Sequence, residues 1–327
     1  MNFRWSAGEE AFRARVVALL RAELPDDWDR LSQHGPGSRQ QTEFSLAFCP
    51  RLAAAGLLVP HWPKEYGGQG GSVWEHQILG EEMWASGEPR GPQYMNVNWI
   101  GPTLMHVGTA EQKERYLREM AQGKAIWCQG FSEPSAGSDL FALRTAAVRD
   151  GDNFVINGSK IWTSYAGLAD HCFLLARTGG KRKEGLCIFL IDMHAPGITV
   201  RPIPSLVGEG DIHEVFFQDV VVPHTAMLGE EGQAAAIIKF ALGNERVGIP
   251  RYEFSRRTLD ATVERLKESG AWRDDYIRFR AGQALAACEA ARVLVYQVVD
   301  QRARGLPPSA DASLARVAVV AADHAVS

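Results

Sequence analysis

A run of small and hydroxyl-bearing residues, CQGFSEPSAGSD, occupies positions 128–139. Glycine and alanine let a flat ring approach the backbone closely, because no bulky side chain stands in the way. The backbone N–H groups of such a run could bind the carbonyl edge of an electron-poor ring. The same composition is also typical of a serine- and glycine-rich loop that binds no ligand. The residues of this segment leave both interpretations open.

A tryptophan and a hydroxyl occur two positions apart in a second segment, NGSKIWTS, at 157–164. On a β-strand, residues two apart project from the same face. A ring could therefore pack on Trp162 while Ser164 donates a hydrogen bond to it. The more ordinary interpretation is a core tryptophan beside a serine at a strand end.

A third segment, LGNERVGI at 242–249, places Glu245 and Arg246 inside an apolar run with helical spacing. Apolar surroundings raise the pKa of a carboxyl group, and a raised pKa suits a general base. The ordinary alternative is a partly exposed glutamate in a salt bridge with its neighbour.

Hydrophobic periodicity indicates which elements must position these segments. Apolar residues at helical spacing predict helices over 9–23, 41–56, 75–86 and 93–107, and a further helix beginning at Thr109. The glycines and prolines of 60–71 predict an ordered loop.

From about residue 125 the pattern changes to that of strands, and Asn157-Gly158 predicts a hairpin turn. Helical spacing resumes at Gln233. It predicts one long helix to about 267, followed by helices over 275–304 and 311–326. We therefore expect an α+β protein with an N-terminal helical domain (1–124), a middle antiparallel β-barrel or sandwich domain (125–229) and a C-terminal helical bundle (230–327).

Composition excludes several classes of protein. The 327 residues are 46% hydrophobic and carry a net charge of −4, which is ordinary for a globular protein and unlike a basic nucleic-acid binder. The five cysteines are scattered, so neither a disulfide framework nor a metal site is expected. No signal peptide or membrane span is recognisable, and we expect a cytoplasmic location.

In their order along the chain, the three segments resemble the acyl-CoA dehydrogenase family. Residues 131–139 end in its [T/S]-E-P-x-A-G-S-D pattern, 157–164 match N-G-x-K-x-[W/F]-[I/T]-[T/S], and 62–70 are similar to its W-P-x-E-[F/Y]-G-G-x-G loop. The resemblance covers essentially the whole chain. It implies an FAD-dependent dehydrogenase that acts on an acyl-CoA and passes electrons to an electron-transfer flavoprotein.

The resemblance also implies roles for individual residues, by position. Ser164 would donate a hydrogen bond to flavin N5, Trp162 would pack beside the ring, and Ser138 would lie near the thioester and pantetheine end of the substrate. The pyrimidine side of the flavin would be lined by Gln129, Phe131 and Ser132.

The catalytic base has two positions in the family. Many members carry it in a late loop, beyond the end of this chain. A subset that includes isovaleryl- and long-chain-type enzymes carries it before an arginine on the first long C-terminal helix, as in Glu245-Arg246. Glu245 is thus the expected base and Arg246 a structural or substrate-positioning residue. Residues 244–249 are also similar to actinobacterial enzymes of steroid side-chain degradation, which favours a bulky or branched acyl group.

Two departures from the family pattern leave alternatives open. The R-x-x-F-G motif that reaches a neighbouring subunit's FAD has no counterpart at 265–272, and the chain ends inside an expected helix. We expect either an incomplete C-terminal domain or a partner that completes the site, in a homotetramer or an α2β2 heterotetramer. The alternatives are a subunit of a heteromeric dehydrogenase, a flavin oxidase or monooxygenase of the same fold, and an interaction module without cofactor.

Overall fold

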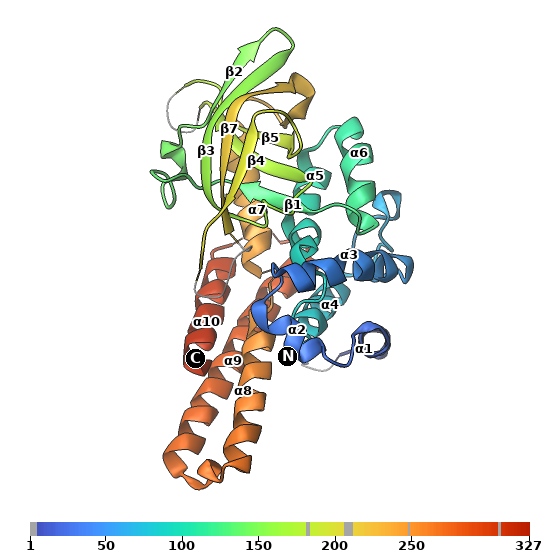
Figure 1. Cartoon of the computed structure of the whole chain (residues 1–327). Helices are drawn as coiled ribbons and strands as arrows, with labels where there is room; N and C mark the ends of the chain where they lie inside the picture. Colours follow the sequence, from blue (N-terminus) through green and yellow to red (C-terminus); the bar gives the residue numbers. More distant parts are fainter. Residues whose placement is uncertain (1–4, 181–183, 206–211, 248, 307–308) are drawn as a thin grey trace.

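The computed structural model describes residues 5–180, 184–205, 212–247, 249–306 and 309–327. In these residues, helices come first, a β-sheet follows and helices return, so the expected fold class is confirmed. Figure 1 shows the sheet at the top, with the helices α8 (Arg251–Glu268) and α9 (Asp275–Ala303) extending away from it as a long hairpin.

The N-terminal part is a group of capped helices packed around an apolar core. Its first long helix begins after Ser6, whose hydroxyl accepts from the backbone of Glu9 while the Glu9 carboxylate accepts from the backbone of Ser6. The predicted helix over 93–107 is instead a π-helical segment, Asn96–Ile100, that continues into a short α-helix. The helices are α1 (Ala7–Glu23), α2 (Trp28–Leu31), α3 (Arg39–Ala54), α4 (Val73–Ala85), α5 (Gly101–Val107) and α6 (Ala110–Ala121).

The middle part is one eight-stranded sheet in the order β6-β7-β3-β2-β4-β5-β8, with β1 paired to β4. Most pairings are antiparallel as expected, but β1 and β2 each run parallel to β4. The strands are β1 (Trp127–Gly130), β2 (Ala146–Asp150), β3 (Asn153–Ser164), β4 (His171–Arg177), β5 (Leu186–Asp192), β6 (Ile198–Pro202), β7 (Ile212–Pro223) and β8 (Met227–Leu228).

The hairpin turn predicted at Asn157-Gly158 is wrong. Strand β3 runs straight through these residues, and the chain reverses earlier, at Gly151. A side chain at Gly158 would collide with Thr145, so glycine here serves the close approach of two strands rather than a turn. Asn157 pairs with Ala146 of β2, and its side-chain amide nitrogen donates to Oδ1 of Asp219 on β7 at 3.0 Å.

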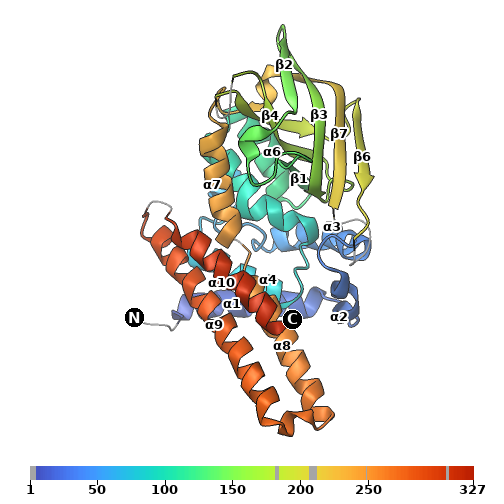
Figure 2. The same cartoon turned by 90° about the vertical axis from the view of Figure 1, so that its left-hand side faces the viewer.

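The single long helix predicted from Gln233 to about 267 is also wrong. The structure has two helices, α7 (Ala234–Val247) and α8 (Arg251–Glu268), separated at Pro250; Gly248 lies outside the described residues. Proline lacks the N–H of a helical hydrogen bond and disfavours helical geometry at the residue before it. Figure 2 shows α7 beside the sheet and α8 directed away from it. The helices α9 (Asp275–Ala303) and α10 (Asp311–Val326) lie close to their predicted bounds.

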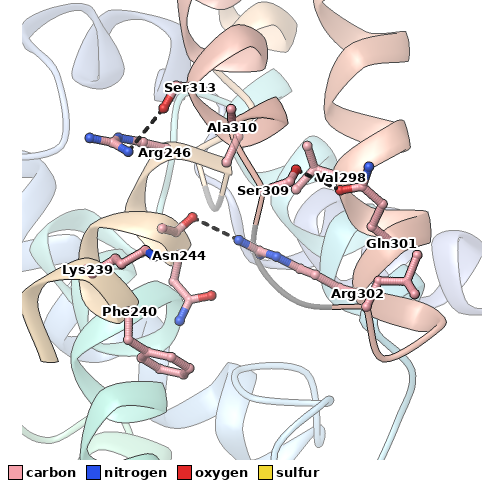
Figure 3. A pocket seen from close by; sticks show the side chains of 13 residues that line it. Lys239, Phe240, Asn244, Arg246, Val298, Gln301, Arg302, Ser309, Ala310 and Ser313 are labelled. Carbon is pink, nitrogen blue, oxygen red and sulfur yellow. Dashed lines mark hydrogen bonds between the residues drawn. The ribbon is translucent and has the colours of Figure 1, made fainter. Parts of the chain in front are cut away.

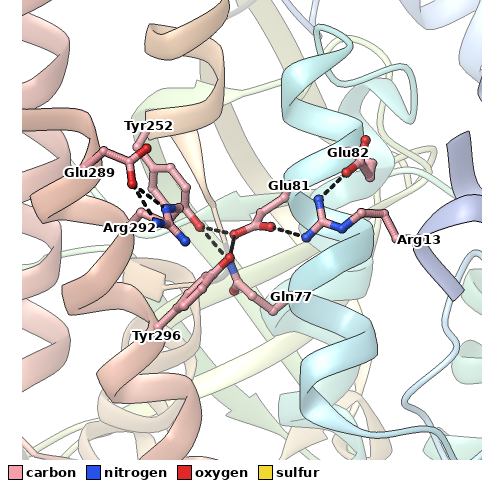
Figure 4. Close-up of polar contacts among 8 residues, drawn as sticks. All are labelled: Arg13, Gln77, Glu81, Glu82, Tyr252, Glu289, Arg292 and Tyr296. Carbon is pink, nitrogen blue, oxygen red and sulfur yellow. Dashed lines mark hydrogen bonds and ion pairs between the residues drawn. The ribbon is translucent and has the colours of Figure 1, made fainter. Parts of the chain in front are cut away.

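A buried carboxylate ties the N-terminal and C-terminal helices together. Oε1 of Glu81 on α4 accepts from the hydroxyls of Tyr252 on α8 and Tyr296 on α9, each at 2.7 Å. Its Oε2 lies 2.9 Å from Nη2 of Arg13 on α1 (Figure 4). Because four helices meet at one side chain, this network fixes the direction in which α8 leaves Pro250.

None of the described helices is long and apolar enough to cross a membrane.

Candidate active site

A cavity of about 290 Å³ lies where the sheet meets α7 and the N-terminal helices. Six of the predicted site residues line it, although they come from three separate segments of the chain. They are Gln129, Phe131, Ser132, Trp162, Ser164 and Glu245.

The segment that carries Phe131 and Ser132 is held against β3 by a buried ion pair. Lys160 Nζ lies 2.8 Å from Oε1 of Glu133 and donates to the carbonyl oxygen of Phe131 at 3.1 Å. The backbone N–H and hydroxyl of Thr145 also donate to Glu133, at 2.9 and 2.6 Å. A buried charge needs such partners, and here they fix the backbone that faces the cavity.

Trp162 stands at an irregularity of β3. Its φ is +60°, in the left-handed region, and the pairing register with β7 shifts between Lys160 and Thr163. Its side chain is 58% exposed, so the interpretation as a core tryptophan is wrong. Left-handed geometry at a bulky residue costs on the order of 1–3 kcal/mol and persists only where the surroundings impose it. An exposed indole presented at this cost, with Ser164 lining the same cavity, suits the packing of a flat ligand.

Glu245 reaches the same cavity from α7. Its Oε2 is buried and has no hydrogen-bond partner, and no basic side chain in the described part of the chain lies within ion-pair distance of it. Burial raises the pKa of the Glu245 carboxyl, while the charges of Arg316 and Arg246 and a hydrogen bond with Gln129 act in the opposite direction. The interpretation as an ordinary salt bridge therefore does not fit, and the group has the environment of a general base.

Trp99 fixes the orientation of Gln129. Its indole N–H donates to Gln129 Oε1 at 2.9 Å. Since the amide oxygen is occupied, the amide nitrogen is the atom left to donate to the Glu245 carboxylate. Trp99 and Gln129 thus connect the N-terminal helices to the Glu245 carboxylate.

Sequence reasoning missed several residues that line the cavity. The aromatic residues of 84–99 contribute Trp84, Tyr94 and Trp99, which their spacing alone assigned to helix packing. Arg316 on α10 also lines the cavity, and its Nη1 is buried without a partner. It is the single arginine of an apolar, alanine-rich segment, 311–326, and that isolation was a usable signal.

Two predicted residues lie outside this cavity. Ser138 is exposed and is not part of its lining. Arg246 is exposed too; it donates to Ser313 Oγ at 3.1 Å and lines a different cavity on the other side of α7.

The residues present fit a flat, polar-edged cofactor. The exposed indole offers a packing surface, and the backbone at Phe131 and Ser132 borders the cavity. Glu245 Oε2 and Arg316 Nη1 are buried polar atoms that lack partners until a ligand supplies them.

Comparison with known proteins shows what the chain as a whole is similar to. The chain matches family models described as the acyl-CoA dehydrogenase N-terminal domain (residues 6–124), middle domain (128–220) and C-terminal domain (232–326). It is 36% identical over 291 residues to acyl-CoA dehydrogenase IpdE1 of Mycobacterium tuberculosis, covering 86% of this chain and 75% of that protein.

Two solved structures are also similar. The Tcur3481-Tcur3483 steroid ACAD superposes with a TM-score of 0.90 at 32% identity, over 100% of this chain and 84% of that one. The ChsE4-ChsE5 complex of Mycobacterium tuberculosis superposes with a TM-score of 0.83 at 30% identity, over 98% of this chain and 83% of that one.

Proposed function

The chain belongs to the acyl-CoA dehydrogenase family of FAD-dependent oxidoreductases, and from this we propose that it oxidises an acyl-CoA thioester to the trans-2-enoyl-CoA. The observation that carries the proposal is the Glu245 carboxylate, which shares one cavity with Trp162 and Ser164. A base is needed on one side of the substrate and a hydride acceptor on the other, and the two sets of residues approach the cavity from α7 and from β3.

Glu245 removes the proton from the α-carbon, and the C–H electron pair becomes the new double bond as hydride leaves the β-carbon. A bound FAD would supply the acceptor for that hydride. Gln129, Phe131 and Ser132 would hold the pyrimidine side of the ring, Trp162 would pack beside it, and Ser164 would donate a hydrogen bond toward N5.

Burial of Glu245 favours the proton transfer, because the α-proton of a thioester is only weakly acidic. The raised pKa makes the carboxylate a stronger base than an exposed glutamate. Trp99 orients Gln129, which moderates the rise in the Glu245 pKa. Ser138 and Arg246 lie outside the cavity, and for them we propose contacts with the pantetheine arm or support of α7.

For the substrate we propose a bulky or branched acyl group. The base sits on the early helix rather than in a late loop, and one similar structure is called a steroid ACAD. For the electron acceptor we propose an electron-transfer flavoprotein, and for the assembly a homotetramer or an α2β2 heterotetramer, the latter supported by the similarity to the ChsE4-ChsE5 complex.

The test is an absorbance spectrum of the purified protein followed by anaerobic addition of acyl-CoA esters. We expect a yellow protein whose flavin bleaches with a bulky thioester, and faster than with butyryl-CoA. Glu245→Gln should keep the flavin bound and reduce bleaching by several orders of magnitude, with Glu264→Gln, at an exposed glutamate of α8, as the control.

Three results would change the proposal. Full activity of Glu245→Gln would remove this residue as the base. Rapid reoxidation by oxygen in place of the flavoprotein acceptor would identify an oxidase. A colourless protein that becomes yellow only with a second subunit would identify the chain as half of a heteromeric enzyme.

A further inference from the structure

A second cavity, of about 420 Å³, lies on the other side of α7 from the candidate active site. It is enclosed by α7, the end of α9 and the start of α10 (Figure 3). It shares no lining residue with the first cavity, although Arg246 here and Glu245 there are neighbours on one helix.

The lining of this cavity is basic. Lys239, Arg246 and Arg302 contribute to it, and no aspartate or glutamate is among its described lining residues. The remaining polar side chains, including Asn244, Gln301 and Ser313, are neutral hydrogen-bonding groups. Three positive charges around one cavity repel one another unless an anion or solvent screens them.

Arg302 is partly buried, whereas the other two cations are exposed. Its Nη2 donates to the carbonyl oxygen of Gly243 at 2.9 Å, so the side chain reaches across the cavity from α9 to α7 (Figure 3). No carboxylate in the described residues forms an ion pair with it. Burial lowers the pKa of this guanidinium to about 10, so it remains charged at neutral pH without a compensating partner.

The acidic groups close to the cavity form their contacts with other groups than its three cations. Oδ2 of Asp311 accepts from Gln301 Nε2 at 2.6 Å and from Ser309 Oγ at 2.9 Å. Asp300 pairs with Arg304 on the outer side of α9. Glu245 faces the other cavity. No carboxylate in the described residues therefore forms an ion pair with Lys239, Arg246 or Arg302.

We propose that this cavity binds a phosphoryl oxyanion, with Arg302 as the anchoring residue and Lys239 and Arg246 as the flanking charges. A guanidinium presents a planar fork of donors that matches phosphate oxygens, and an ammonium adds a point charge. Three cations suit a multiply charged phosphate better than a single carboxylate. The proposal does not depend on the reaction in the neighbouring cavity.

A bound oxyanion would also influence the candidate base. The charge of Arg246 lowers the pKa of Glu245, and an anion beside Arg246 would offset that effect. The Glu245 pKa would then rise, so the reaction would need a higher pH. This consequence, unlike the binding itself, rests on the proposed function.

Binding is tested by calorimetric titration of the full protein with inorganic pyrophosphate at constant ionic strength. We expect saturable binding at one site and at least about tenfold weaker binding in Arg302→Gln, which removes a charge-assisted contact. Lys239→Gln changes an exposed side chain and should also weaken binding. Arg302→Lys should restore part of it. Arg273→Gln, at an exposed arginine of the α8–α9 hairpin, should bind as tightly as the wild type.

A second arm distinguishes the sources of the phosphate. If adenosine 3′,5′-bisphosphate or an acyl-CoA displaces pyrophosphate, the ligand of the cavity is the phosphate end of a nucleotide. If pyrophosphate stays bound in their presence, the ligand is a free phosphate compound. The proposal is overturned if pyrophosphate gives no saturable heat, or if it binds the wild type, Lys239→Gln and Arg302→Gln equally.

Discussion

The ammonium group of Lys160 lies 2.8 Å from the carboxylate of Glu133, and both side chains are almost completely buried. One belongs to the NGSKIWTS segment and the other to the CQGFSEPSAGSD segment. The pair thus joins the two segments that border the candidate flavin site. It stands behind the cavity rather than in it, so its role is to position the backbone of Phe131 and Ser132.

Removing one partner of this pair should lower the stability of the fold. Lys160→Met leaves the Glu133 carboxylate buried beside an apolar side chain, and breaking such a pair costs about 3–5 kcal/mol. Urea unfolding should show this loss, and Lys124→Met, at an exposed lysine, should show almost none. Unchanged stability of Lys160→Met would mean that the pair contributes nothing to the fold.

The same pair predicts that the stability of the protein depends on pH. Burial alone would raise the Glu133 pKa, but Lys160 and the hydrogen bonds from Thr145 and Arg144 leave it lowered. A carboxyl group with a lowered folded-state pKa contributes stability above its unfolded pKa and loses it as the pH falls. The stability difference between wild type and Glu133→Gln should therefore shrink as the pH falls below about 4.5, the ordinary value. A difference that stays constant down to pH 3 would contradict this.

Trp99→Phe should alter the pH profile of the reaction. Without the indole N–H, the Gln129 amide is free to turn, and its hydrogen bond to Glu245 is weakened. That bond lowers the Glu245 pKa, so its loss raises the pKa, and the acidic limb of the flavin-reduction rate should move to higher pH. Trp272→Phe, on the α8–α9 connection, is the matched control. If the acidic limb of Trp99→Phe lies at the same pH as that of the wild type and of the control, Trp99 is not a positioning residue.

Arg316→Gln should move the acidic limb in the same direction and further. The charge of Arg316 lowers the Glu245 pKa more than any other group does, and only burial, which acts in the opposite direction, has a larger effect. Arg316→Lys keeps that charge and should restore most of the wild-type profile. Stopped-flow reduction across pH 5–9 measures the limb, and a profile that is the same for glutamine and lysine would show that Arg316 does not act through its charge.

Glu253 on α8 should make the protein less stable as the pH rises. Burial and the nearby carboxylates of Glu81 and Glu82 raise its pKa to about 7. The folded state then holds a proton that the unfolded state releases from about pH 4.5 upward, so this group's contribution to stability falls between pH 4.5 and 7. Glu253→Gln should be more stable than the wild type at pH 8 and similar to it at pH 4. Parallel thermal-melting curves for the two proteins across this range would contradict the assignment.

Local sequence determined most of the elements and the identity of the site segments. Helix bounds followed from apolar spacing and caps, as at Thr109, and the three chemical segments were recognisable from residue types in a fixed order. The prediction at Asn157-Gly158 is wrong because Thr145, a neighbour outside the local segment, decided the conformation there. The prediction at Pro250 is wrong because the apolar pattern on both sides of this proline is helical, although the proline itself ends the helix.

Only the tertiary structure decided which residues meet. Trp99, Gln129, Glu245 and Arg316 come from four distant parts of the chain, and no periodicity relates them. The environment of Glu245 depends on burial and on charges from another helix, which are properties of packing. The sequence by itself determined the chemical groups and the helices and strands that carry them, because those depend on local interactions. The direction of each group, its pKa and the basic cavity behind α7 arise from contacts between residues far apart in the chain, and so only the folded structure decided them.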